Sequence, residues 1–172
     1  MPFINIEIKA KCFHPEKVEA FLFANHAEYK GIDKQKDTYF NVPAGRLKLR
    51  QGNIENTLIY YHRPNQAGPK QSDFSITQVG DGPTIENLLA AALGVLVVVE
   101  KRRKIFYISN VKFHIDEVPG LGSFVEIEAG NMLNESLTEK DLLAQCELYM
   151  RAFEIEEKDL IENSYSDMLL NN

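Results

Sequence analysis

The sequence has no long apolar run, and its first residues do not look like a targeting segment. No stretch of about eighteen or more apolar residues occurs, which is the length that a membrane-spanning helix needs. The opening residues, MPFINIEIKAK, lack the basic-then-apolar pattern of a secretory signal peptide. We therefore expect a cytoplasmic protein that has no membrane partner.

Cysteine is scarce, because Cys12 and Cys146 are the only two residues of this type. They lie far apart in the sequence, and two free thiols suit a reducing compartment better than a disulfide framework does. They are also too few for a structural zinc site built from thiolates. The cysteine content therefore favours a reducing compartment.

Positive charge is not in excess, since the formal net charge is −6 over 172 residues. A negative protein is a poor general binder of nucleic acid, whose affinity depends on neutralising phosphates. Any cluster of cations should thus be local, with a small anion as its partner. The remaining composition, 44% hydrophobic and 26% charged residues, is typical of one globular domain, which we expect to span residues 1–172.

Alternation of polar and apolar residues recurs along the chain and predicts strands. The predicted strands lie near residues 3–12, 37–42, 46–51, 57–63, 73–79, 96–108, 111–118 and 123–129. Most of the turns between them, such as VPAG, GDGP and PGLG, are too short for a parallel crossover, so neighbouring strands should be antiparallel. About eight strands can close into a barrel, and with helices the fold class is α+β.

Helical spacing of apolar residues and helix-capping residues predict three longer helices and two short helical pieces. They lie near residues 14–27, 84–94, 138–153, 156–161 and 164–170. Thr84 is a candidate N-cap of the second helix, and Thr138 with Asp141 forms a capping-box pair at the third. The side chains expected in the core are Leu88, Leu89, Leu93 and Phe153.

The charged faces of the predicted strands are sorted by sign. In GRLKLRQ (45–51), Arg46, Lys48 and Arg50 share one strand face, while Leu47 and Leu49 share the other. Adjacent like charges on a strand repel one another unless something neutralises them. Two further pairs repeat this sorting, namely Lys101 with Arg103, and Glu126 with Glu128. His114 and Asp116 share a face of the strand between these two pairs.

Two readings of this pattern are open. The first is an antiparallel sheet with one solvated face and one core face. The second is a site in which a polyphosphate neutralises the cations and a divalent metal ion neutralises the carboxylates. Arginine offers paired donors to phosphate oxygens, and carboxylates two residues apart on a strand point the same way, which suits Mg²⁺ or Mn²⁺. Sorting by sign favours the second reading.

The motifs together resemble those of the CYTH superfamily, also called triphosphate tunnel metalloenzymes. This superfamily includes class IV adenylate cyclases, thiamine triphosphatases and inorganic triphosphatases, and the sequence looks most similar to the cyclase-type members. The N-terminal ExExK motif appears as NIEIK (5–9). The other motifs follow in the family's order over almost the whole chain: KDTYFNVPAGRLKLR (36–50), LIYYHRP (58–64), VEKRRKIFYI (99–108), HIDEVPGLGSFVEIE (114–128) and SYSDML (164–169).

The resemblance implies an eight-stranded antiparallel closed barrel whose polar lumen binds a triphosphate with the help of Mg²⁺ or Mn²⁺. It implies that Glu7, Glu126 and Glu128 hold the metal, and that Asp116 and Lys9 take part in catalysis. The implied substrate-binding residues are Lys9, Lys11, Arg46, Lys48, Arg50, Arg63, Lys70, Lys101 and Arg103, of which Lys70 lies in a Gly/Pro-rich loop and could act as a lid cation. The chain departs from the motif at Asn5, whose side-chain oxygen could ligate a metal only without charge.

Three functions remain open from the sequence. The leading one is a cyclase-like conversion of ATP to cyclic AMP and pyrophosphate. The alternatives are hydrolysis of inorganic triphosphate, a nucleoside triphosphate or thiamine triphosphate, and non-catalytic binding of a nucleotide or polyphosphate. The expected partner is therefore a small molecule bearing a triphosphate, not a nucleic acid, and the oligomeric state is open, with a homodimer as one option.

Overall fold

We describe residues 3–171 of a computed structural model of the chain, in which eight strands form a closed barrel. The strands are β1 (Phe3–Lys11), β2 (Glu28–Phe40), β3 (Arg46–Gln51), β4 (Asn56–His62), β5 (Lys70–Gln78), β6 (Val95–Ile108), β7 (Val111–Val118) and β8 (Gly122–Gly130). Their order around the barrel is β1-β5-β4-β3-β2-β6-β7-β8, and every neighbouring pair is antiparallel. The predicted α+β closed barrel is confirmed.

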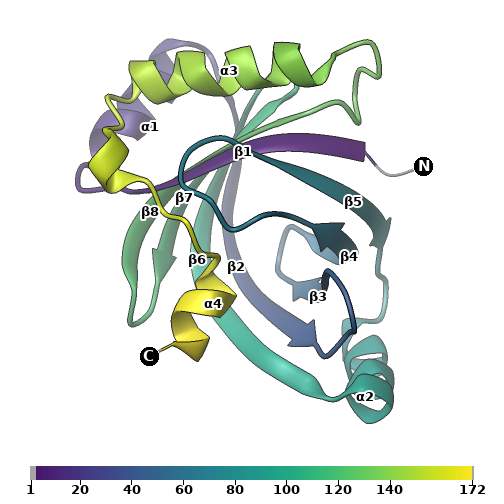
Figure 1. The fold of residues 1–172 in the computed structure, drawn as a ribbon. Helices are drawn as coiled ribbons and strands as arrows, with labels where there is room; N and C mark the ends of the chain where they lie inside the picture. The colour runs from purple at the N-terminus through teal and green to yellow at the C-terminus, as the bar shows by residue number, and fades with distance from the viewer. Residues whose placement is uncertain (1–2, 172) are drawn as a thin grey trace.

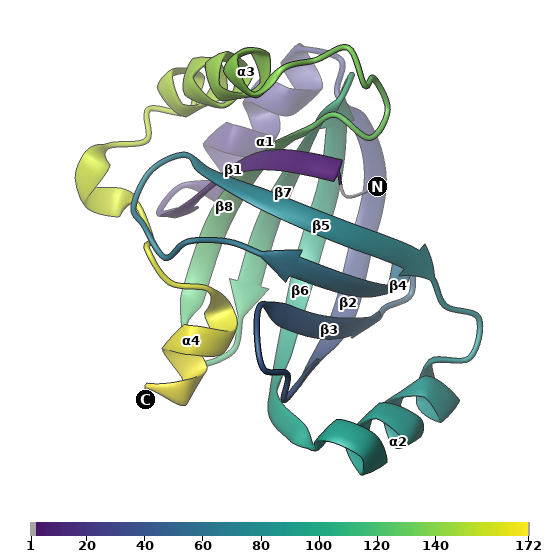
Figure 2. The same cartoon turned by 45° about the vertical axis from the view of Figure 1, so that its right-hand side comes forward.

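The helices lie outside the barrel (Figures 1 and 2). They are α1 (Pro15–Ala24), α2 (Gly82–Leu93), α3 (Glu139–Ala152), the 3₁₀ turn η1 (Glu157–Asp159) and α4 (Tyr165–Leu170). The predicted capping box at the start of α3 is confirmed, because the side chain of Thr138 accepts from the backbone of Asp141 and that of Asp141 accepts from the backbone of Thr138. Among residues 3–171, no helix has both the length and the apolar character needed to cross a membrane.

Strand β2 is longer than its prediction, because it begins at Glu28 and not near residue 37. Its first part, EYKGIDKQK, has polar residues on both faces, since Asp33 and Gln35 point into the barrel and Lys34 and Lys36 point out. A strand that is polar on both sides shows no apolar alternation, so period-two reasoning cannot detect it. The lumen residue Asp37 nevertheless lies on this strand, between the cations of β3 and β6.

The main hydrophobic core lies outside the barrel, between its wall and two helices. The outward side chains of β1, β7 and β8 pack against α1 and α3, which both figures show on the same side of the barrel. Ile8, Phe113 and Ile127 from the wall, with Leu142 from α3, are all 1% exposed or less. The apolar face of each of these strands therefore points away from the lumen, and the charged face points into it.

Helix α2 differs from the prediction in its cap and in its packing. Its N-cap is Asp81, whose side chain accepts from the backbone N–H of Thr84, so the expected cap at Thr84 is wrong. The expected core positions Leu88 and Leu93 are 61% and 37% exposed. The helix packs on β2 and β3 at the far end of the barrel from α3, and none of its residues is buried by the described part of the chain.

Replacing Leu142 by alanine tests whether the outer core holds the barrel together. We expect Leu142→Ala to lower the free energy of unfolding by about 2–5 kcal/mol, because it removes a fully buried side chain and leaves a cavity. Urea denaturation measures this change. Leu148→Ala on the same helix is the control, since Leu148 is 51% exposed and its loss should cost less than about 0.5 kcal/mol. Equal losses in both variants would contradict the assignment of the core.

Candidate functional site

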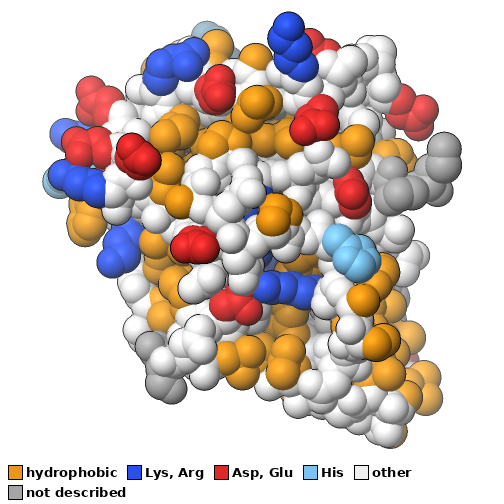
Figure 3. Space-filling model, in the orientation of Figure 1, with side chains coloured by type: hydrophobic (Ala, Val, Ile, Leu, Met, Phe, Trp, Pro, Cys, Tyr) orange, Lys and Arg blue, Asp and Glu red, His pale blue; other side chains and the backbone are white. Residues whose placement is uncertain are grey.

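The lumen of the barrel is a charged cavity of about 140 Å³. A buried water needs only about 10–15 Å³ of such volume, so the lumen can hold several waters or part of a small anion. Figure 3 shows Lys and Arg side chains within a hollow at the centre of one face of the molecule. Among the described residues, the lining cations are Lys9, Lys48, Arg50, Arg63, Lys101, Arg103 and Lys112, and the lining carboxylates are Glu7, Asp37, Glu55, Glu126 and Glu128.

Asp37 on β2 is the common partner of the cations from β3 and β6. Its two oxygens accept from Arg50 Nε and Nη2 at 2.9 Å, and Oδ2 also accepts from Lys101 Nζ at 2.6 Å. Lys48 Nζ lies farther away, 3.9 Å from Oδ2. Burial alone would raise the pKa of Asp37, but these three cations hold it well below its ordinary value. Arg50 and, at longer range, Lys48 of GRLKLRQ are thus balanced by a carboxylate that was not among the predicted site residues.

Glu55 brings a second carboxylate into the lumen from the turn between β3 and β4. It accepts from Arg50 Nη1 at 3.1 Å and forms an ion pair with Lys112 on β7. The buried carboxylate of Asp33 fixes this turn by accepting from the backbone N–H of Ile54 and of Glu55, each at 2.9 Å. Gly52 is required beside it, because a Cβ there would collide with the Asp33 side chain.

The acidic residues of β1 and β8 form the other part of the lumen. The register places Glu7 opposite Glu128 and Lys9 opposite Glu126. Glu7 pairs with Arg63, and Glu126 lies 3.4 Å from Lys9 Nζ. Within residues 3–171, Glu128 has no cation at ion-pair distance. Burial raises the pKa of Glu128; the charge of Lys112 opposes this rise, and the charges of Glu7 and Glu126 add to it.

These carboxylates fit a divalent metal ion. Glu7, Glu126 and Glu128 supply hard oxygen donors from two neighbouring strands, and Glu128 lacks a counter-ion that a metal would provide. Asn5 acts here as a donor, because its Nδ2 donates to Glu128 Oε1 at 2.6 Å. The residue that replaces the first glutamate of the motif thus holds one of the expected metal ligands in place.

Asp116 and Arg103 form a buried pair on β7 and β6. Arg103 donates from Nε and Nη2 to the two oxygens of Asp116, both at 2.7 Å, and the hydroxyl of Tyr165 donates to Oδ2 at 2.8 Å. Asp116 is fully buried and does not line the cavity. Its carboxylate therefore fixes the guanidinium of Arg103, which does line the cavity.

His114 lies on the lumen wall, two residues before Asp116. Its Nδ1 is 3.2 Å from Glu126 Oε2, and only 2% of the residue is exposed. Burial lowers the pKa of His114 to about 4, and the charge of Arg103 contributes to this shift. The imidazole is therefore neutral near pH 7. The sequence analysis placed it on the correct face without giving it a specific function.

Two of the predicted phosphate ligands, Arg46 and Lys70, instead form hydrogen bonds with the C-terminal segment. Arg46 donates to the hydroxyls of Ser164 and Ser166 and, at 2.7 Å, to Asp167. The expected loop lysine, Lys70, instead begins β5, is 2% exposed, and donates to the backbone carbonyl of Glu162 at 2.7 Å. Neither residue lines the cavity. The expected loop position of Lys70 is thus wrong, since the residue lies in a strand and the segment after α3 covers it.

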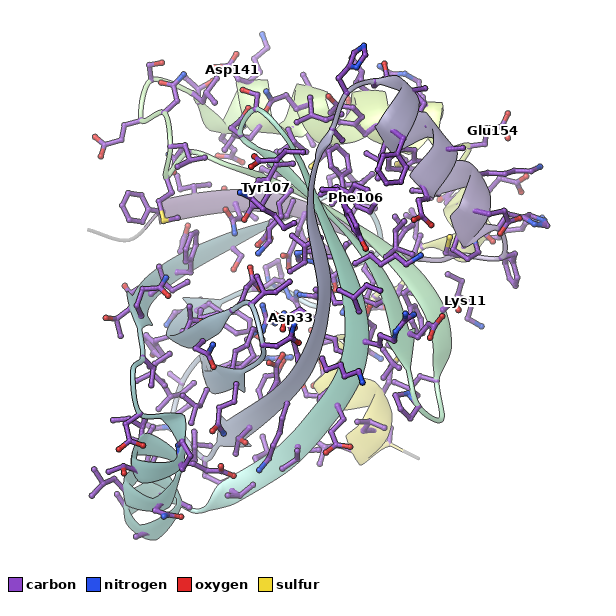
Figure 4. The ribbon with its side chains drawn as sticks, turned by 180° about the vertical axis from the view of Figure 1, so that it is seen from behind. Lys11, Asp33, Phe106, Tyr107, Asp141 and Glu154 are labelled. Atoms are coloured by element: carbon purple, nitrogen blue, oxygen red, sulfur yellow. The ribbon has the colours of Figure 1, made fainter. Side chains whose placement is uncertain are left out.

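Lys11 also lies outside the lumen. It is exposed at the end of β1, on an outer groove with Cys12 and Phe13, and Figure 4 shows its side chain on the outer side of the barrel. The structure therefore does not bring Lys11 together with Lys9, although the two residues are two positions apart on β1 and were expected to share one face of the strand. The predicted phosphate ligands that do line the lumen are Lys9, Lys48, Arg50, Arg63, Lys101 and Arg103.

The β4–β5 part of the lumen is mostly uncharged. Ile59 and Tyr61 from β4, with Phe74 and Ile76 from β5, line the cavity there. Tyr39 from β2 lies close to Tyr61, and Lys48 Nζ lies 5.3 Å from the centre of the Tyr61 ring. One part of the cavity can thus bind phosphate and another can contact an apolar or aromatic group.

The charge network makes a pH-dependent prediction for Asp37→Asn. We expect this variant to lose about 3–5 kcal/mol of stability at pH 7, because Arg50 and Lys101 lose their buried partner. The folded-state pKa of Asp37 is depressed, so its contribution is present above the unfolded value near 3.8 and is lost as the pH falls below it. Urea denaturation at pH 7 and pH 3 should show a smaller difference from wild type at pH 3.

The matched control for Asp37→Asn is Asp73→Asn, an exposed aspartate on β5 whose neutralisation should change stability by less than about 0.5 kcal/mol. A difference between Asp37→Asn and wild type that does not shrink at low pH would show that Asp37 is not the ionised partner of these cations.

Solved structures with the same fold share little sequence with the chain. The PH1012 protein of Pyrococcus horikoshii OT3 has a TM-score of 0.80 at 23% identity, over 95% of this chain and 98% of that one. A candidate adenylate cyclase from Vibrio parahaemolyticus has a TM-score of 0.78 at 18% identity, over 99% of both chains. A candidate adenylyl cyclase from Hippeastrum, described as having a dominant triphosphatase activity, has a TM-score of 0.59 at 14% identity, over 96% and 94%.

The sequence comparisons give one family. No curated protein matches the chain. The family model of the CYTH domain matches residues 4–165, which include all of the barrel strands except Phe3, and all the residues that line the lumen. The chain therefore belongs to the CYTH domain family, as its motifs predicted.

Proposed function

We propose that the chain is a divalent-metal-dependent enzyme that binds a triphosphate in the lumen of its barrel and acts like a class IV adenylate cyclase. In that reaction the ribose 3′-oxygen of ATP attacks the α-phosphate, cyclic AMP forms and pyrophosphate leaves. The observation that carries the proposal is the convergence of lumen cations from β3 and β6 on the single carboxylate of Asp37. A chain of phosphates has the charge needed to take the place of that carboxylate.

The cations differ in how firmly the protein already holds them. Arg50 and Arg103 each bind a carboxylate through two hydrogen bonds, so both are held in the orientation that a bidentate phosphate contact needs. Lys48 has only a distant ionic partner, and burial, with the charge of Arg50, lowers its pKa well below the ordinary value. A bound phosphate would stabilise the charged form of Lys48. We therefore expect the charge state of Lys48 to depend on phosphate binding more than that of the other lumen cations.

Lys9 and Asp116 have separate parts in this proposal. Lys9 lies between the acidic and basic groups, 3.4 Å from Glu126 and 3.6 Å from the centre of the Tyr165 ring. We assign it the neutralisation of charge that develops on the departing phosphate oxygens. Asp116 has both oxygens occupied by Arg103, so it holds that guanidinium against the substrate and does not act as the base.

Glu7, Glu126 and Glu128 are the residues that would hold Mg²⁺ or Mn²⁺, and divalent-metal dependence is general in the CYTH family. When bound, the ion supplies further neutralisation of charge on the phosphate oxygens. Glu126 has the central position, because it also contacts Lys9, Arg103 and His114.

The uncharged part of the lumen supports a substrate with an organic group. Ile59, Ile76 and Tyr61 offer apolar and aromatic surface that inorganic triphosphate would leave without a partner. A nucleoside triphosphate could use both parts of the cavity. This favours a triphosphate that carries an organic group, such as ATP, over inorganic triphosphate, and the products of the reaction would identify which reaction occurs.

Hydrolysis of the triphosphate is the second candidate. The Hippeastrum protein with the same fold is described as having a dominant triphosphatase activity, and the same lumen cations would serve either reaction. A third possibility is binding without turnover, which rests on the uncharged Asn5 at the first position of the ExExK motif.

A substrate panel separates these functions. Purified protein is incubated with Mn²⁺ and with ATP, GTP, tripolyphosphate or thiamine triphosphate, and the products are separated by chromatography. We expect cyclic AMP and pyrophosphate from ATP. Orthophosphate would support the triphosphatase, and binding without product would support the non-catalytic protein. If no triphosphate binds even at low salt, the lumen is not a triphosphate site.

The lumen assignment is tested by Lys48→Ala and Arg102→Ala. We expect Lys48→Ala to weaken tripolyphosphate binding about 10-fold or more, because it removes a buried charge-assisted contact. Arg102 precedes Arg103 on β6 but points outward with its side chain 44% exposed, so its removal should leave affinity within about 2-fold. Isothermal titration calorimetry measures both. Similar losses in the two variants would place the anion outside the barrel.

A further inference from the structure

His114 has a buried ring nitrogen without a partner beside the acidic part of the lumen. Its Nε2 is inaccessible to solvent and accepts or donates no hydrogen bond to any of the described residues. Leaving a buried polar atom unpaired costs about 1–3 kcal/mol, so such an atom calls for an explanation. The other ring nitrogen, Nδ1, points toward Glu126, so it is the atom of this lumen-lining residue that a ligand held by Glu126 could reach.

Carboxylate oxygens lie beside Nδ1 of His114, although the cations Arg103 and Lys112 also lie near the ring. His114 and Glu126 are directly opposite one another on β7 and β8, with Nδ1 3.2 Å from Oε2. Potential ligand atoms of His114, Asp116 and Glu126 all lie within 4.8 Å of one another. Asp116 is committed to Arg103 through both oxygens, which leaves the imidazole and Glu126 as the available donors.

Asn5 reduces the number of charged oxygen donors in the lumen. The chain lacks the charge of the first motif glutamate, and Asn5 donates to Glu128 where a glutamate would add an oxygen donor. A metal ion in this lumen therefore has fewer charged oxygens available from β1. A neutral nitrogen donor on β7, which pairs with the Glu126 strand β8, completes the donor set without adding negative charge.

We propose that His114 supplies an imidazole nitrogen to the divalent metal ion held by Glu126, so that the metal centre has mixed nitrogen and oxygen donors. The inference rests on the metal dependence proposed above. An imidazole ligand suits first-row transition ions, whereas Mg²⁺ prefers oxygen donors. The centre therefore binds Mn²⁺ in preference to Mg²⁺ by more than a site of carboxylates alone would.

Pulsed electron paramagnetic resonance of the Mn²⁺-loaded protein tests this directly. A bound imidazole nitrogen gives a characteristic modulation of the Mn²⁺ echo, and carboxylate and water ligands do not. We expect that modulation in the wild type and its loss in His114→Gln. Mn²⁺ affinity should fall about 10–100-fold in this variant, and Mg²⁺ affinity by much less.

A second variant keeps the test valid if His114→Gln does not fold. His14, His26 and His62 are the other histidines of the chain, and all three are exposed. The triple change His14→Gln, His26→Gln and His62→Gln should leave the modulation unchanged, because only His114 then remains.

The outcomes separate this inference from the proposed function. Mn²⁺ that binds without nitrogen modulation, or whose modulation persists in His114→Gln, overturns the inference and leaves the metal-dependent function standing. Failure of Mn²⁺ to bind at all, with and without tripolyphosphate, overturns both.

Discussion

The structure depends on the mutual neutralisation of buried charges inside a closed barrel. Asp37 binds Arg50 and Lys101, Glu55 joins Arg50 to Lys112, and Asp116 holds Arg103. Removing charges from water is costly unless each finds a partner, so a lumen lined by cations alone would oppose folding. These carboxylates neutralise the lumen cations in the absence of a ligand, and in the proposed function a highly charged anion takes the place of some of them.

The barrel has its hydrophobic side outward, and this arrangement makes a charged lumen possible. The apolar faces of β1, β7 and β8 are buried under α1 and α3, which supply the hydrophobic core that a polar interior cannot. At the other end of the barrel, α2 leaves Leu88 and Leu93 exposed, because no further element of the described chain packs on it. The outward faces of these strands therefore form the hydrophobic core, and their inward faces line the candidate binding site.

Much of this arrangement is predictable from the sequence, because strand alternation assigns each side chain to a face. It correctly placed Lys48, Arg50, Lys101 and Glu126 in the lumen, and the same parity places Lys112 there, although it was overlooked. Alternation says nothing about where a strand leaves the lumen, so Lys11 was wrongly grouped with Lys9. Glu55 lies in a turn, and the partners of Arg46 and Lys70 come from the C-terminal segment, so only the folded chain shows them.

The central claim is that the lumen cations exchange their carboxylate partners for phosphate. A crystal structure of the protein with Mn²⁺ and a non-hydrolysable ATP analogue tests it most directly. We expect phosphate oxygens in contact with Lys48, Arg50 and Lys101, with the Asp37 carboxylate displaced from at least one of these cations. Phosphates bound on the outer face of the barrel, or a lumen whose ion pairs remain unchanged at saturating ligand, would contradict it.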